Sequence, residues 1–110
     1  MLDNLIRLSY VSTLRPHVTV ADIDAMVAKA SDFNKAHDIT GILAIEGERV
    51  CQILEGPDGA VDALYASIER DERHHGVTLI VRRPIEKSVF EAWGMARRPM
   101  VDIAIYALTN

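Results

Sequence analysis

The segment Ile39–Pro57 restricts the fold more than any other stretch of this 110-residue chain. It contains two runs rich in apolar and β-branched residues, Ile39–Glu46 and Arg49–Glu55, separated by a short polar turn around Gly47. A glycine in such a turn supplies the positive φ that short hairpin connections need. The segment is therefore predicted to form a β-hairpin.

Gln52 is the unusual residue of this hairpin. Because side chains alternate along a strand, Val50, Gln52 and Leu54 share one face, while Cys51 and Ile53 share the other. A carboxamide on a core-facing strand needs hydrogen-bond partners, and leaving them unmade costs roughly 1–3 kcal/mol. Either the core or a ligand must supply those partners.

The remaining elements follow from periodicity. A first strand is predicted at Leu5–Ser12, with Ile6, Leu8 and Tyr10 on one face. The other predicted elements are a helix from Thr19 to about His37, a helix at Gly59–Arg70, a strand at Val77–Arg83 that Pro84 ends, and a short fifth strand around Trp93–Arg97.

Helix termini and buried faces are also readable. Thr19 and Asp22 form an acidic version of a capping box, and Asp58 is an expected N-cap of the second helix. The first helix has an apolar stripe that includes Val27 and continues into the polar Asn34. The second helix is expected to bury Val61, Leu64, Tyr65 and Ile68.

This order of elements predicts an α+β, ferredoxin-like (βαββαβ) mixed sheet with two helices on one face, a fifth strand and a short C-terminal segment. We expect the first and third strands to be central, parallel neighbours. Tyr10 and Gln52 would then be adjacent on the helix-covered face, with Asn34 above them. A planar, hydrogen-bonding ligand between the helices would explain all three polar residues. Each also has a simpler explanation when taken alone, as a satisfied core residue or, for Asn34, a helix cap.

Composition excludes several classes of protein. A net charge of −4 argues against a general nucleic-acid binder. The single Cys51 permits no internal disulfide and favours a reducing cytoplasm, where it is expected to be an inert hydrophobe. The start of the sequence lacks the basic region and long apolar core that are expected of a signal peptide, and no apolar run approaches the about 20 residues that span a membrane. Glycine motifs for nucleotide binding are missing.

His74 and His75 fall in the polar connection Asp71–Gly76, which is interpreted as a solvated loop rather than a metal site.

Several segments together resemble one family. They are RLSYVS at Arg7–Ser12, FNKAHDITGIL at Phe33–Leu43, CQILEGP at Cys51–Pro57, RDERHHGV at Arg70–Val77 and PIEKSVFEAWGM at Pro84–Met95. In this order and spacing, the chain from Leu5 to Met95 resembles the BLUF family of small flavin-binding blue-light sensors. The resemblance implies FAD bound noncovalently between the two helices.

The resemblance also implies roles for individual residues. Tyr10 matches the tyrosine that gives an electron and a proton to the photoexcited flavin, and Gln52 matches the glutamine that bridges this tyrosine to the flavin. Asn34 matches the asparagine that pairs with the polar edge of the ring. The other matching positions are Trp93 and Met95, a fifth-strand pair that relays the switch, and Arg73 and His74, which lie near the flavin.

The expected protein is thus a blue-light photoreceptor and not an enzyme. Residues 1–97 would form the flavin-binding domain, and residues 98–110 a short tail or reduced cap. We expect a cytoplasmic homo-oligomer that signals to a separate, unidentified effector protein and binds neither nucleic acid nor membrane. The alternative is a small ferredoxin-like enzyme, or a dimeric module, whose cleft holds another aromatic ligand.

Overall fold

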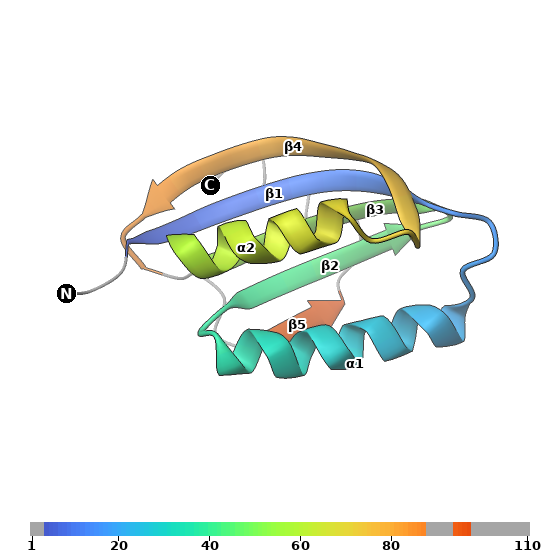
Figure 1. The fold of residues 1–110 in the computed structure, drawn as a ribbon, viewed down its shortest axis with the longest axis horizontal. Helices are drawn as coiled ribbons and strands as arrows, with labels where there is room; N and C mark the ends of the chain where they lie inside the picture. The colour runs from blue at the N-terminus through green and yellow to red at the C-terminus, as the bar shows by residue number, and fades with distance from the viewer. Residues whose placement is uncertain (1–3, 88–93, 98–110) are drawn as a thin grey trace.

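The computed structural model describes residues 4–87 and 94–97. Their elements, in chain order, are β1 (Leu5–Leu14), α1 (Val20–Ala36), β2 (Thr40–Glu46), β3 (Arg49–Pro57), α2 (Asp58–Glu69), β4 (His74–Ile85) and β5 (Gly94–Arg97). The predicted ferredoxin-like βαββαβ order is confirmed. Both helices lie on the same face of the sheet (Figure 1). Trp93 and the tail at 98–110 lie outside the described residues.

The strands are ordered β4-β1-β3-β2-β5, so β1 and β3 are central neighbours as expected. Their predicted direction is wrong, because β1 and β3 are antiparallel. The α1 crossover makes β1 and β2 run the same way, and β3 is inserted between them after a hairpin, so it opposes both. The pairing of β5 with β2 is parallel.

The central hairpin is confirmed. β2 and β3 pair from Thr40 opposite Glu55 to Glu46 opposite Arg49, which leaves a two-residue turn. Gly47, the first residue of that turn, has φ +61°. This backbone conformation is strained for residues with a side chain, and glycine adopts it at little cost.

The two helices begin differently. At α1 the capping box is confirmed: the Asp22 N–H donates to Thr19 Oγ1 at 3.1 Å, and the Thr19 N–H donates to Asp22 Oδ2 at 2.9 Å. At α2 the predicted cap is wrong, because the N-cap is Pro57 and Asp58 is the first helical residue. The Asp58 carboxylate instead accepts a bond from the adjacent Gly59 N–H at 2.7 Å.

β4 is longer than expected at both ends. It begins at His74, which pairs with Leu14 of β1, so the predicted loop is wrong for both histidines. It also continues through Pro84, which the sequence had suggested as its end. Proline is tolerated because β4 lies at the sheet edge, where one side of the strand needs no ladder hydrogen bonds.

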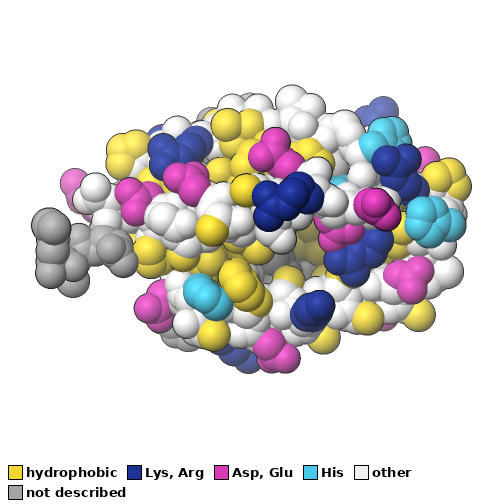
Figure 2. Space-filling view, viewed as in Figure 1, with side chains coloured by type: hydrophobic (Ala, Val, Ile, Leu, Met, Phe, Trp, Pro, Cys, Tyr) yellow, Lys and Arg dark blue, Asp and Glu magenta, His cyan; other side chains and the backbone are white. Residues whose placement is uncertain are grey.

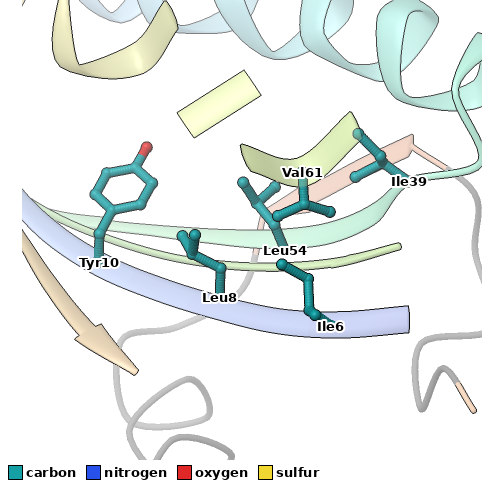
Figure 3. Packing of buried hydrophobic residues seen from close by; sticks show 6 residues of the cluster. All are labelled: Ile6, Leu8, Tyr10, Ile39, Leu54 and Val61. Carbon is teal, nitrogen blue, oxygen red and sulfur yellow. The ribbon is translucent and has the colours of Figure 1, made fainter. Parts of the chain in front are cut away.

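Tyr10 belongs to the hydrophobic core beneath α2. The buried members of this core are Ile6, Leu8, Tyr10, Ile39, Leu54 and Val61 (Figure 3). As predicted, Val61 is buried, and Leu64, Tyr65 and Ile68 pack against this cluster. A second cluster, Leu14, Ile23, Leu43 and Val50, lies against α1. Within the described residues, no helix is both long and apolar enough to cross a bilayer.

Candidate functional site

Tyr10 and Gln52 stand directly opposite each other on β1 and β3. Both are buried, with 3% and 5% of their surfaces exposed. The Tyr10 hydroxyl donates a hydrogen bond to Gln52 Oε1. The predicted adjacency is therefore present, and the amide oxygen has a partner from the neighbouring strand.

The Tyr10 ring is packed between α2 and β4. The Tyr65 ring lies 5.8 Å from it in a tilted arrangement, and the His74 ring lies 6.4 Å away, nearly edge-on. Burial raises the pKa of Tyr10 above its usual value, and the neighbouring Cys51 and Asp71 add to this effect. Tyr10 is therefore a neutral phenol with its proton held toward Gln52.

A cavity of about 380 Å³ opens beside this pair, between the two helices and the sheet. Its volume is in the range of small-molecule sites. Figure 2 shows this face hollowed between the helices, with hydrophobic side chains around the hollow and basic side chains beside it. Tyr10 and Gln52 are polar lining residues in a largely apolar wall, which includes Ile23, Val27 and Leu43.

Asn34 has a different place. Its exposure is 0%, and it is not among the cavity-lining residues, although Ala30 and Phe33 of the same helix are. Neither atom of its side-chain amide has a hydrogen-bond partner within the described part of the chain. Its backbone carbonyl accepts bonds from the His37 and Ile39 N–H groups at 3.1 and 2.8 Å. An orphaned, buried amide is costly, and it fits a polar ligand edge.

Arg73 and His74 also line the cavity. The Arg73 Nε donates to Asp71 Oδ1 at 2.9 Å, and this bond lowers the pKa of Asp71. His74 Nδ1 lies 2.8 Å from Ser12 Oγ, and its Nε2 lies 2.7 Å from the Ile68 carbonyl oxygen. Both residues are thus held by the protein itself.

The fifth-strand pair is only partly described. Met95 lies in β5, where its backbone is paired with Gly41 of β2. Trp93 lies outside the described residues.

The sequence reasoning missed a buried ion pair. Arg7 Nη2 lies 2.7 Å from Glu55 Oε2, with side-chain exposures of 5% and 0%. The two residues are opposite each other on β1 and β3, three positions from Tyr10 and Gln52, on the other face of the sheet. Correct strand directions would have identified them as partners. Within the described residues, no group of three or more His, Cys, Asp or Glu side chains is placed to hold a metal ion.

Comparison with known proteins agrees with this geometry. The family model described as "BLUF: Sensors of blue-light using FAD" matches residues 5–96. The blue light- and temperature-regulated antirepressor BluF of Escherichia coli is 39% identical over 77 residues, which are 70% of this chain and 18% of that protein. The photoactivated adenylate cyclase subunit alpha of Euglena gracilis is 35% identical over 86 residues, 78% of this chain and 8% of that protein. The chain thus spans less than a fifth of either relative.

Solved structures give the same result. The dark-state structure of BlrB, a BLUF protein, is 32% identical with a TM-score of 0.84, and the match covers 99% of this chain and 81% of that one. Klebsiella pneumoniae BlrP1 with FMN and cyclic diGMP is 33% identical with a TM-score of 0.81, covering 93% of this chain and 28% of that one. The matched family is described as one of blue-light sensors, and the cofactor named in that description is FAD. This chain belongs to the BLUF family of blue-light sensors.

Proposed function

We propose that this protein holds FAD in the cavity between α1, α2 and the sheet and uses the Tyr10–Gln52 hydrogen bond as a light-driven switch. The observation that carries the proposal is the Tyr10 hydroxyl donating to Gln52 Oε1 at the cavity wall. The orphaned amide of Asn34 supports it, because a turn of this side chain toward the cavity that Ala30 and Phe33 line would give both amide atoms partners on the polar edge of a flavin ring.

The two residues have complementary chemistry. FAD held here would supply a ring that absorbs blue light and that, once excited, could take an electron and a proton from a nearby donor. Tyr10 gives up both and takes both back, so nothing is consumed. Gln52 can present either its carbonyl oxygen or its N–H group to the same neighbour. Once the electron and the proton have returned to Tyr10, the Gln52 amide is left rotated or tautomerised. The hydrogen bonds at the site then differ from those in the dark.

To act as a signal, the change in hydrogen bonding at Gln52 must be passed on to another protein. We assign the relay to Met95, because β5 pairs with β2, and β2 pairs with the strand that carries Gln52. Trp93, which lies outside the described residues, is assigned to the relay from the family resemblance alone. We assign flavin contacts to Arg73 and His74, which line the cavity. Residues 1–97 would form the sensor and residues 98–110 the tail. The signal would pass to a separate effector in the cytoplasm, with the sensor as a homo-oligomer.

The Gln52→Leu variant tests the switch. It should still take up flavin, because the apolar cavity wall remains, but it should lose the reversible red shift that blue light produces in the flavin absorption band. Cys51→Ala is the matched control, since it alters the adjacent residue on the opposite face. The control should keep the shift. A normal light-minus-dark spectrum from Gln52→Leu would disprove the switch.

A further inference from the structure

His74 joins three elements at the cavity wall. It is the first residue of β4, and its ring nitrogens bond to Ser12 of β1 and to the Ile68 carbonyl of α2. Its ring lies edge-on to Tyr10 at 6.4 Å and 74°. Because the protein engages both ring nitrogens, the contact that we assign between His74 and a flavin would be made by the ring carbons and not by a nitrogen.

The two partners determine where the ring protons lie. A backbone carbonyl only accepts hydrogen bonds, so Nε2 of His74 must carry a hydrogen. In a neutral ring Nδ1 is then an acceptor, and the buried Ser12 hydroxyl is placed to donate to it. The imidazolium form would donate from both nitrogens, and the Ser12 hydroxyl would have to turn away.

We propose that His74 is a positioning residue that must be neutral for Tyr10 to act as an electron donor. This inference rests on the function proposed above. A tyrosine that loses an electron becomes more positive, and an imidazolium 6.4 Å from its ring would oppose that change. Screening is weak at this distance because Tyr10 is buried. The light response should therefore decrease when His74 becomes protonated.

The other titratable and charged groups near His74 do not account for this expected effect of pH on the light response. The titratable and charged groups near His74 are Tyr10 on β1, Tyr65 and Glu69 on α2, Asp71 and Arg73 in the connection before β4, and Asp22 of α1 through Arg73. Asp71 and Arg73 form an ion pair and largely offset each other. Among these residue types, histidine is the one whose ordinary titration range lies between about pH 5 and 8.

The ring state can be measured without any light response. Nitrogen-15 NMR of the labelled protein should show His74 at neutral pH with hydrogen on Nε2 and none on Nδ1. The exposed neighbour His75 provides an internal comparison in the same spectra. A ring with hydrogen on Nδ1, or a charged ring at pH 8, would overturn the proposal whether or not the protein responds to light.

The functional test uses the flavin-loaded protein and counts photoproduct formed per absorbed photon from pH 5 to 8.5. The wild-type yield should follow the His74 charge seen by NMR. His74→Gln should give a yield independent of pH, because an amide does not change its charge with pH. The local structure should persist, because this amide can still donate to the Ile68 carbonyl. His75→Gln should behave like wild type. A fixed charge in His74→Lys should lower the yield about tenfold or more, while His75→Lys leaves it unchanged.

The outcomes separate the two proposals. A wild-type yield that changes with pH while His74 stays neutral, a full yield from flavin-loaded His74→Lys, or a pH profile kept by His74→Gln would overturn the role of His74. Failure of wild type to respond to light at any pH would instead disprove the switch, and the NMR result would still decide the state of His74.

Discussion

Two polar pairs join the same two strands and behave in opposite ways. Tyr10–Gln52 and Arg7–Glu55 are both directly opposite on β1 and β3, three positions apart. The first pair is neutral and lines a cavity between the helices. The second is a buried ion pair on the other face of the sheet.

The difference lies in how many arrangements each pair permits. A guanidinium only donates and a carboxylate only accepts, so Arg7 and Glu55 have one mode of pairing, and separating them leaves a buried charge. A phenol and an amide can each donate or accept, so Tyr10 and Gln52 have more than one mode. We therefore expect the ion pair to hold the register of the central strands, and the neutral pair to change its hydrogen bonding without altering that register.

Breaking the ion pair should give the largest effect on stability. Glu55→Leu leaves Arg7 buried without its carboxylate and should lower the free energy of unfolding by about 3–5 kcal/mol, measured by urea denaturation. The double variant Arg7→Met, Glu55→Leu should recover most of this loss, because no charge remains buried. A Glu55→Leu protein as stable as wild type would show that the pair does not hold the strands.

Removing the orphaned amide should act in the opposite direction. In flavin-free protein, Asn34→Leu should raise the free energy of unfolding by about 1–3 kcal/mol, because a buried amide without partners is lost. The same variant should bind flavin more weakly in a reconstitution titration. Lower stability together with unchanged flavin affinity would mean that Asn34 belongs to the core alone.

The contribution of Tyr10 to the free energy of unfolding should decrease at alkaline pH. Burial raises the pKa of Tyr10, so the unfolded chain loses this proton near pH 10 while the folded chain keeps it. Stability from the neutral phenol is complete below pH 10 and is lost above it, by at most about 1.4 kcal/mol per pH unit. Chemical denaturation between pH 9 and 11.5 should show this slope, and Tyr10→Phe should reduce it. Equal slopes in both proteins would contradict the assignment.

The smallest effect is expected from the hydroxyl itself. Tyr10→Phe removes one hydrogen bond to Gln52 and should cost flavin-free protein about 1 kcal/mol. Tyr65→Phe, which changes the partly buried neighbour, is the matched control and should cost less. A loss near that of Glu55→Leu would mean that the neutral pair is as rigid as the charged one.

Sequence reasoning reached the neutral pair because its signals are local. Strand alternation places Tyr10 with Ile6 and Leu8, and it places Gln52 with Val50 and Leu54. The topology then makes the two strands neighbours. The charged pair was missed because its identification requires the antiparallel register, in which Arg7 and Glu55 follow directly once Tyr10 faces Gln52.

The His74 region was unpredictable for another reason. The run from Asp71 to Gly76 has the composition of a loop, yet His74 is ordered by Leu14 across the sheet and by bonds to Ser12 and Ile68. Ser12 and Leu14 are about 60 residues away from His74 in the chain, and only the tertiary fold brings them close to it. At the start of α2, the Asp58 N–H donates to the Asn4 carbonyl at 2.8 Å, another contact between distant parts of the chain, and Pro57 rather than Asp58 is the N-cap.

The most direct test of the central claim is the visible absorption spectrum of the flavin-loaded protein in the dark, immediately after blue light, and through recovery. The account predicts a flavin spectrum that shifts slightly to the red and returns in the dark, with the flavin still oxidised. A flavin spectrum that does not change, or a protein that takes up no flavin when FAD is supplied, would contradict it.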